Sequence, residues 1–273
     1  MTTAAKQRKP FSLKKQPGFS FIAIACFVML YAPIFVLIVY SFNLGENIAL
    51  WEGFSLKWYV SAWHNEAVQD ASIRSLILAL QASIYGTVLA TMAALGTTRI
   101  RPFKGLTFIY VMINQPLMVP EIVTAVALLT LFAIIKIVTG IQGMVYLVAA
   151  HTAFCIPFAY LPIRARLESM DLMLETAASD LYATPWKTFK RVTLPLLWPG
   201  IIAGAMLAFV ISLDDVVITE FIKSSGQETL PTYMLGQLRR IVTPEINAIS
   251  TVLVCISITV LGVFFIVDKK FGK

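Results

Sequence analysis

Residues 19–42 read FSFIAIACFVMLYAPIFVLIVYSF and carry no acidic or basic side chain. A helix needs about 20 mostly apolar residues to cross a hydrocarbon core about 30 Å thick. The run is longer than the apolar region of a signal peptide, and it has no clear cleavage site with small residues. It therefore predicts a first membrane-spanning helix that is not cleaved.

The composition of the whole chain points the same way. Hydrophobic residues make up 58% of the sequence, charged residues only 14%, and the mean hydropathy is +0.78. A soluble domain is about a quarter charged and avoids the large apolar surfaces that this chain would expose to water. The apolar runs are continuous and do not alternate, which disfavours a membrane β-barrel. We therefore predict an all-α membrane protein.

Six apolar runs are long enough to span a membrane, about as many as 273 residues allow once loops are included. They lie at residues 19–42, 72–97, 105–135, 143–163, 197–222 and 246–267. The third run is long and contains Pro116 and Pro120, so we expect its helix to be broken or tilted.

The placement of Lys and Arg indicates the orientation. If the N-terminus is cytoplasmic, sixteen of the 22 basic residues fall in cytoplasmic segments. They are Lys6, Arg8, Lys9, Lys14, Lys15, Arg99, Arg101, Lys104, Arg164, Arg166, Lys187, Lys190, Arg191, Lys269, Lys270 and Lys273. Cytoplasmic loops are enriched in Lys and Arg, so both termini are predicted to be inside (N-in/C-in). The net charge of +7 then reflects topology, and no nucleic-acid partner is expected.

This topology divides the chain into four parts. They are a basic cytoplasmic tail (1–18), a first span with a periplasmic interfacial segment (19–71), a core domain (72–267) and a second cytoplasmic tail (268–273). The interfacial segment contains the aromatic residues Trp51, Phe54, Trp58, Tyr59 and Trp63. Such rings are common at the boundary between membrane and water, and a contact with an external partner is the alternative.

Residues 164–196 form a cytoplasmic loop that is too long for a plain connection. Asp171 is a candidate N-cap for a short amphipathic helix. Thr184 as N-cap and Pro185 in the first turn suit the start of a second helix. We expect Leu194-Pro195 to end that second helix. Two short helices at an angle predict a surface that binds another protein.

The loop also carries a two-part motif. It reads LETAASDLYATPW at 174–186, then RVTLP at 191–195 and PGI at 199–201. This motif resembles the EAA loop of type I ABC importer permeases, which implies that fold with its cytoplasmic coupling helices. In that family the first short helix of the loop docks into a cleft of the cytoplasmic ATPase. The resemblance assigns ATPase coupling to Glu175, Thr176, Ala177, Ala178, Asp180, Leu181 and Tyr182.

Two positions depart from the family pattern. Thr176 stands where the family has Glu, with Glu175 one residue earlier, and Tyr182 stands where the family has Gly. Glycine permits a positive φ between the two helices, which tyrosine resists, so we expect a differently shaped turn. The departures call ATPase coupling through this subunit into question, and a partner permease with an intact motif would compensate.

Further segments resemble the spermidine/putrescine permeases within that family. They are SLDDVV (212–217), TLP (229–231), PEINA (244–248), WEGFSLKWY (51–59), PEIV (120–123) and HTAFC (151–155). The group more often has Asp where this chain has Glu121. The resemblance implies that Ser212 and Trp58 take part in transport. Alternatively, Ser212 bonds back to its own helix and Trp58 only anchors the interface.

Three acidic residues lie well inside predicted spans, Glu121, Asp214 and Asp215, and a fourth, Glu220, lies at the outer end of its span. Charges at membrane depth are costly and mark transport pathways by default. None of the first three has a basic partner within its own span, so an ion pair would need a partner from another span. By helical rise, Asp215 lies roughly 27 Å and Glu121 roughly 24 Å from the cytoplasmic starts of their runs. The two carboxylates are therefore expected at similar depth and are candidates for one substrate pathway.

Several acids without Lys or Arg suit a polycation such as putrescine or spermidine. The resemblance then implies an ATP-driven polyamine importer of the bacterial inner membrane. Its partners would be a second homologous permease, two cytoplasmic ATPase subunits, a periplasmic substrate-binding protein and membrane lipid. The chain has no GxxxxGK[ST] loop, so ATP and Mg²⁺ are expected on the ATPase and no cofactor on this chain.

Other functions stay open at this point. The same fold would carry another cation, an amino acid or a sugar, and an assembly subunit would have no pathway of its own. A membrane-embedded enzyme is disfavoured, because the two histidines, His64 and His151, lie in distant segments. Cys26, Cys155 and Cys255 fall in separate runs and match no metal-site spacing, so we expect no metal.

Overall fold

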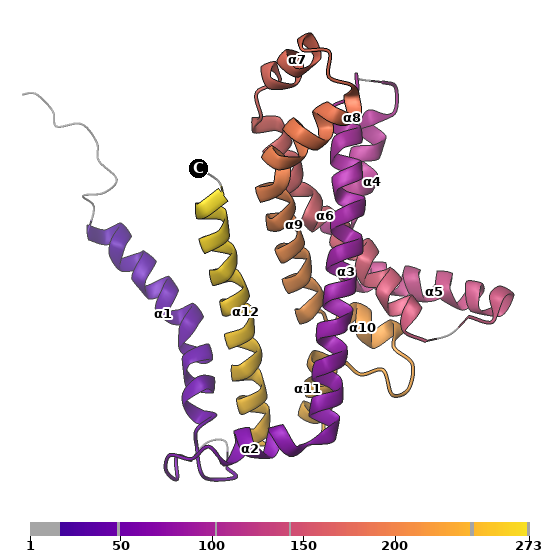
Figure 1. Ribbon diagram of the computed structural model, residues 1–273. Coiled ribbons are helices and arrows are strands. Elements are labelled where there is room, and N and C mark those ends of the chain that lie inside the picture. The colour runs from indigo at the N-terminus through magenta and orange to yellow at the C-terminus, as the bar shows by residue number, and fades with distance from the viewer. Residues whose placement is uncertain (1–16, 48–49, 102, 142, 241–242, 272–273) are drawn as a thin grey trace, which may run out of the picture.

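The computed structural model describes residues 17–47, 50–101, 103–141, 143–240 and 243–271 as an array of helices (Figure 1). The helices are α1 (Pro17–Tyr40), α2 (Lys57–His64), α3 (Glu66–Thr98), α4 (Leu106–Met118), α5 (Glu121–Thr139), α6 (Met144–Ser169), α7 (Met173–Asp180), α8 (Pro185–Thr188), the π-helical turn η2 (Phe189–Thr193), α9 (Leu194–Asp214), α10 (Val217–Ile222), α11 (Leu230–Leu238) and α12 (Pro244–Phe271). Within these ranges the β-structure is a single bridge between Asn43 and Phe54. The all-α prediction is confirmed.

Six helical segments are long and apolar enough to cross a membrane. They are α1, α3, α5, α6, the continuous stretch Pro185–Asp214 and α12. The predicted number of spans is therefore confirmed. The start of α1 and the end of α12 lie toward the end of the molecule that holds α7 and α8, whereas α2 lies at the other end (Figure 1). The basic residues before residue 17 and Lys273 lie outside the described ranges.

The core lies where α3, α6 and α9 pack together, and small residues let these helices approach closely. Ala90 of α3, Ala159 of α6 and Ala208 of α9 have no exposed surface. A Cβ on Gly204 of α9 would lie 2.7 Å from the carbonyl oxygen of Ala159. Glycine is therefore required at this contact, which sets the spacing between α6 and α9.

The third predicted span is broken, as its prolines indicated. Helix α4 ends at Met118, and Val119 is extended, with φ −91° and ψ 137°. A residue before proline avoids the helical region because it clashes with the proline ring, so Pro120 places the break here. Helix α4 alone, with 13 residues, is too short to span the membrane. Helix α5 begins at Glu121 and points away from the bundle axis in Figure 1.

The prediction that Leu194-Pro195 ends a helix is wrong. The chain stays helical from Pro185 to Asp214. The π-helical turn η2 lies just before Pro195, and the N–H of Leu194 donates to the carbonyl of Phe189. Such a turn takes up one extra residue, so it re-registers the helix ahead of a proline that cannot donate. The second coupling helix is thus continuous with a membrane span.

The segment between α1 and α2 is held by Asn43, which is buried. Its amide nitrogen donates to the carbonyl of Leu50 at 2.6 Å, and its amide oxygen accepts from the N–H of Glu52 at 2.8 Å. Trp58 of α2 donates from Nε1 to the carbonyl of Asn43 at 2.8 Å. These bonds fix α2 against the end of α1, where the aromatic residues of the segment gather.

Candidate functional site

The helix α9 ends at Asp214, and α10 begins three residues later at Val217. Between them Asp215 is extended, with φ −65° and ψ 131°. We call this interruption, residues 214–217, the α9–α10 break. An interrupted helix at membrane depth leaves backbone groups that need partners other than water. Breaks of this kind in transporters often form substrate or ion sites.

Asp215 supplies those partners. Its Oδ1 accepts from the N–H of Ile218 at 3.3 Å, and its Oδ2 accepts from the N–H of Thr219 at 2.9 Å. The hydroxyl of Thr219 donates to the same Oδ2 at 2.8 Å. The side chain of Asp215 is only 1% exposed. It therefore acts as the N-terminal cap of α10 and faces the protein interior.

His151 of α6 also reaches the break. Its Nδ1 shares a hydrogen bond with the hydroxyl of Ser212 at 2.8 Å, and its Nε2 one with Thr219 at 2.9 Å. The same Nε2 lies 3.4 Å from Oδ2 of Asp215. A polar partner for the intramembrane acid is thus present, on a different span. The sequence interpretation missed His151 as a site residue, although a histidine inside a span is itself a functional signal.

Glu121 and Asp214 complete an acidic cluster around the break. Glu121 begins α5, and its carboxyl interacts with that of Asp215. Asp214 interacts electrostatically with Asp215 but is exposed on the surface of the isolated chain. The structure therefore brings together the three acids that the sequence placed at similar depth. Of the three residues, Asp214 is exposed, Glu121 is partly exposed and Asp215 is buried.

The other two predicted pathway residues, Ser212 and Trp58, differ in whether they contact the acidic cluster. Ser212 belongs to the cluster through His151, but it is buried and faces the protein interior. Trp58 lies in α2 and contacts Asn43 and the ammonium of Lys57, which is 4.7 Å from its ring. No described contact joins Trp58 to the acids. The described contacts of Trp58 hold the interfacial segment, and its part in transport stays a prediction.

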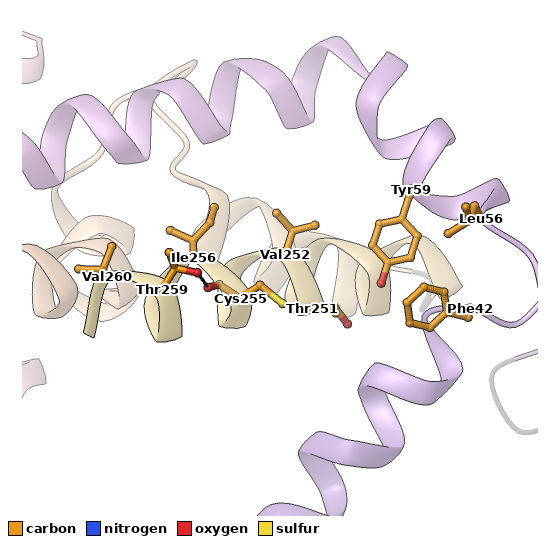
Figure 2. Close-up of a pocket in the computed structure, with 9 residues that line it drawn as sticks. All are labelled: Phe42, Leu56, Tyr59, Thr251, Val252, Cys255, Ile256, Thr259 and Val260. Atoms are coloured by element: carbon orange, nitrogen blue, oxygen red, sulfur yellow. Dashed lines mark hydrogen bonds between the residues drawn. The ribbon is translucent and has the colours of Figure 1, made fainter. Parts of the chain in front are cut away.

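An open groove of about 510 Å³ lies near that segment, against α12. Phe42, Leu56 and Tyr59 face one side of it, and side chains of α12 from Thr251 to Val260 form the other (Figure 2). None of the residues that line it is charged. Its chemistry suits an apolar occupant such as a lipid chain and not a polycation, so the acidic cluster remains the candidate site.

Residues 164–196, the predicted coupling loop, form a second candidate region. Glu175 of α7 accepts at Oε1 from Nε of Arg99 at 3.1 Å and from the hydroxyl of Thr193 at 3.0 Å. Arg99 follows α3, and it also donates to the carbonyl of Leu167 at 3.1 Å. Glu175 therefore fastens α7 to the ends of three other helical segments.

The remaining coupling residues face outward. Thr176 bonds back to the carbonyl of Leu172, and Ala177, Asp180, Leu181 and Tyr182 are exposed, whereas Ala178 is partly covered. The shift of the acid from position 176 to 175 thus turns it toward the membrane bundle. The exposed face that remains on α7 is mostly apolar or uncharged.

The expectation of a differently shaped turn at Tyr182 is wrong. Tyr182 adopts φ +58°, the left-handed conformation that glycine favours. Its N–H donates to the carbonyl of Ser179 at 2.9 Å, and the N–H of Ala183 donates to Ala178 at 3.0 Å. These two bonds form a Schellman motif, which satisfies the last carbonyls of α7. The hydrogen bonds of that motif outweigh the steric cost of a left-handed tyrosine.

Among the described residues, no group of three or more His, Cys, Asp or Glu is arranged to hold a metal ion. Within the acidic cluster, Asp215 accepts hydrogen bonds from backbone N–H groups and from Thr219, and it lies close to His151.

Comparison with known proteins identifies the family of the chain. Residues 86–273 match the model of "Binding-protein-dependent transport system inner membrane component". The putrescine transport system permease protein PotI of Escherichia coli (strain K12) is 38% identical over 85% of this chain and 84% of its own length. The spermidine/putrescine permease PotC of the same strain is 34% identical over 86% and 87%.

The fold agrees with that match. A bacterial ABC transporter involved in the import of the acidic polysaccharide alginate superposes with a TM-score of 0.67, at 15% identity and 93% coverage of both chains. At this identity the likeness concerns the fold alone. The chain therefore belongs to the binding-protein-dependent transport system inner membrane components, the multi-pass permease subunits of ABC importers, in which ATP hydrolysis lies in a separate subunit.

Proposed function

We propose that this permease imports polyamines, with putrescine and spermidine as cargo. The observation that carries the proposal is the acidic cluster of Glu121, Asp214 and Asp215 at the α9–α10 break. Three carboxyl groups with one histidine and no Lys or Arg among their described contacts form a site that attracts positive charge. PotI and PotC carry polyamines in their names, and each is at least a third identical to this chain, which supports the same cargo.

Within this proposal, Asp214 and Glu121 contact the ammonium groups of the cargo, while Asp215 and Ser212 maintain the break. The carboxylates replace the water that surrounds each ammonium in solution. The end of α4 supports the site further, because the break at Pro120 frees carbonyl groups that also face a cation. Trp58 contributes by holding the periplasmic segment in place.

The transport cycle requires partners. We infer a second homologous permease beside this chain, two ATPase subunits that bind ATP and Mg²⁺ beneath α7, and a periplasmic substrate-binding protein. The family description, which names binding-protein-dependent transport, supports the last of these. Binding of ATP closes the ATPase pair, and α7 transmits that movement to the spans. Glu175 is the residue best placed to pass the movement on, because it joins α7 to Arg99.

We also infer that the end with α7 is cytoplasmic. The basic residues gather toward that end, and the start of α1 and the end of α12 lie near it. The parts of the chain then follow the predicted order: cytoplasmic tails at 1–18 and 268–273, a first span with periplasmic segment at 19–71, and the permease core at 72–267 with its coupling loop at 164–196.

Uptake into proteoliposomes tests the cargo. The complete complex is reconstituted with its ATPase and binding protein, and ATP-dependent uptake of labelled putrescine and spermidine is measured. We expect saturable uptake of at least one amine. Asp214→Asn is expected to raise the KM about tenfold or more, because it removes a charge-assisted contact with the ammonium.

Asp70→Asn is the matched control, because Asp70 is an exposed carboxylate of α3 outside the cluster. It is expected to transport like the wild type. If a complex with active ATPase takes up neither amine, the permease assignment stands and the polyamine cargo is wrong. Unchanged uptake by Asp214→Asn would instead remove the acidic cluster from the pathway.

A further inference from the structure

The side chain of His151 joins three elements at the α9–α10 break. It comes from the first third of α6, and the residue is only 1% exposed. Its two ring nitrogens bind opposite sides of the break: Nδ1 binds Ser212 of α9, and Nε2 binds Thr219 of α10. A single rigid ring thus spans the gap that the helical backbone leaves open.

The direction of these hydrogen bonds can be deduced. The hydroxyl of Thr219 donates its proton to Oδ2 of Asp215. The oxygen of Thr219 must therefore accept its second bond, so Nε2 of His151 carries the donated proton. His151, Thr219 and Asp215 form a continuous chain of hydrogen bonds, and Asp215 is held toward the interior by it.

This arrangement fixes which acid faces outward. Asp214 and Asp215 are adjacent, yet one is exposed and the other is 7% exposed. A rotation of the break would exchange their directions, because both belong to the same short interruption. The bonds made by His151 oppose that rotation from both sides.

We propose that His151 is the positioning residue of this site: it braces the α9–α10 break so that Asp214 is presented to the cargo while Asp215 remains the internal cap. The identity of the cargo rests on the proposed function, whereas the presentation of Asp214 does not. His151 itself is buried behind the break and does not contact the cargo.

The first experiment needs no cargo. Asp214→Cys is introduced into a chain whose native cysteines are replaced (Cys26→Ser, Cys155→Ala and Cys255→Ser), and the assembled complex is treated with a cationic methanethiosulfonate reagent. We expect ready modification when His151 is present and modification about tenfold slower in His151→Leu, because two buried hydrogen bonds are lost. Equal rates would overturn the proposal.

Conservative replacements separate positioning from general stability. His151→Asn places an amide near the former Nδ1 and can bind Ser212, and His151→Gln places one near Nε2 and can bind Thr219. Each is expected to restore part of the modification rate. Every compared variant carries the same Cys155→Ala replacement, so its effect cancels; Cys155 is buried one helical turn along α6 and bonds to Ala208 and not to the break.

Transport supplies a second readout. In the wild-type background, His151→Leu is expected to raise the KM for putrescine about tenfold, with recovery in His151→Gln. A purely structural role would lower the amount of assembled complex and leave the KM unchanged, which would overturn the proposal. If the wild-type complex transports no polyamine, the proposed cargo fails, while the modification rates of Asp214→Cys still decide the role of His151.

Discussion

At the scale of single residues, Glu175 connects the coupling loop with the membrane helices. Its carboxylate accepts from Arg99 and Thr193, and both partners of the ion pair are about one-fifth exposed, at 18% and 23% for their side chains. An ion pair that is partly shielded from water keeps more of its strength than a fully exposed one. One side chain therefore joins α7 to Arg99 after α3 and to Thr193 of η2.

Glu175→Gln is expected to separate ATP hydrolysis from transport. The amide keeps the shape and one hydrogen bond but removes the charge that holds Arg99, so each hydrolysed ATP moves less cargo. Uptake and phosphate release are measured together in proteoliposomes, which gives the amount of cargo moved per ATP hydrolysed. We expect this ratio to fall several-fold in Glu175→Gln.

Glu168→Gln is the matched control. Glu168 pairs with Arg164 at 2.7 Å within α6, and its side chain is 53% exposed, so its loss is expected to change little. If both variants reduce the ratio equally, Glu175 has no special part in coupling.

The backbone conformation of Tyr182 is imposed by the hydrogen bonds around it and not by its own side chain. Its φ of +58° is required by the Schellman bonds, and its side chain is nearly free in solvent, with the residue 97% exposed. A left-handed conformation costs about 1–2 kcal/mol for a residue other than glycine, and more for a β-branched one. The N–H of Ala183 closes the motif, so its rate of hydrogen exchange depends on this conformational cost.

The amide of Ala183 is therefore expected to exchange about tenfold faster in Tyr182→Val than in Tyr182→Gly, as followed by hydrogen exchange. Both variants lose the same exposed ring, so each is the control for the other. Equal exchange would mean that the motif does not depend on the conformation of residue 182.

At the scale of elements, close approach of helices decides the packing. Gly204 of α9 meets the backbone of α6, whereas a Cβ on Gly96 of α3 would meet nothing within 4 Å. The two glycines thus differ in what an added methyl group would encounter, although both lie inside long helices. Gly204 is needed for the contact between α6 and α9, whereas Gly96 makes no such contact.

Gly204→Ala is expected to lower the thermal stability of the detergent-solubilised complex, since the added carbon overpacks against Ala159 at a cost of about 1–3 kcal/mol. Gly96→Ala is expected to leave stability unchanged or raise it, because alanine favours a helix by about 1 kcal/mol over glycine. A stable Gly204→Ala complex would show that α6 and α9 can move apart without loss.

Elements also show how far the sequence could be interpreted. The break at Pro120 and the start of α8 at Thr184 follow from local chemistry, and both were predictable. The π-helical turn before Pro195 was not, because it depends on the helix continuing into a span. The helical rise predicted that Glu121 and Asp215 lie at similar depth, and that could be worked out from the sequence. The pairing of Asp215 with His151 could not, because it depends on how α6 packs against α9, which no local pattern encodes.

At the scale of the whole molecule, the spans differ in how much of their surface the chain itself covers. The most apolar part of α6 is 50% buried, that of α5 is 6% buried and that of α1 is not buried at all. In lipid, an apolar helix with satisfied backbone groups is stable without such cover. Helices α1 and α5 are therefore arranged to face lipid or another subunit.

The inferred orientation predicts which surfaces each side of the membrane can reach. In a chain without native cysteines, Ser224→Cys is expected to react with a membrane-impermeant maleimide in intact spheroplasts. Ser224 is exposed and follows α10, which lies in the half of the molecule away from α7 (Figure 1). Ser179→Cys on α7 is expected to react only after permeabilisation. The reverse pattern would invert the orientation and the assignment of the ATPase surface.

The contact between α1 and α12 has a consequence for synthesis. In the part of the chain that the structure describes, α1 and α12 are the first and last helices. They come into contact near the end of α1, beside α2, which also contacts α12 (Figure 1). During translation α1 is made well before α12, the helix that it contacts. A chain that stops before residue 244 lacks α12 altogether. In such a chain α1 and α2 lack the helix that they contact. Premature termination near the C-terminus therefore exposes helices near the N-terminus, where a quality-control protease can bind them.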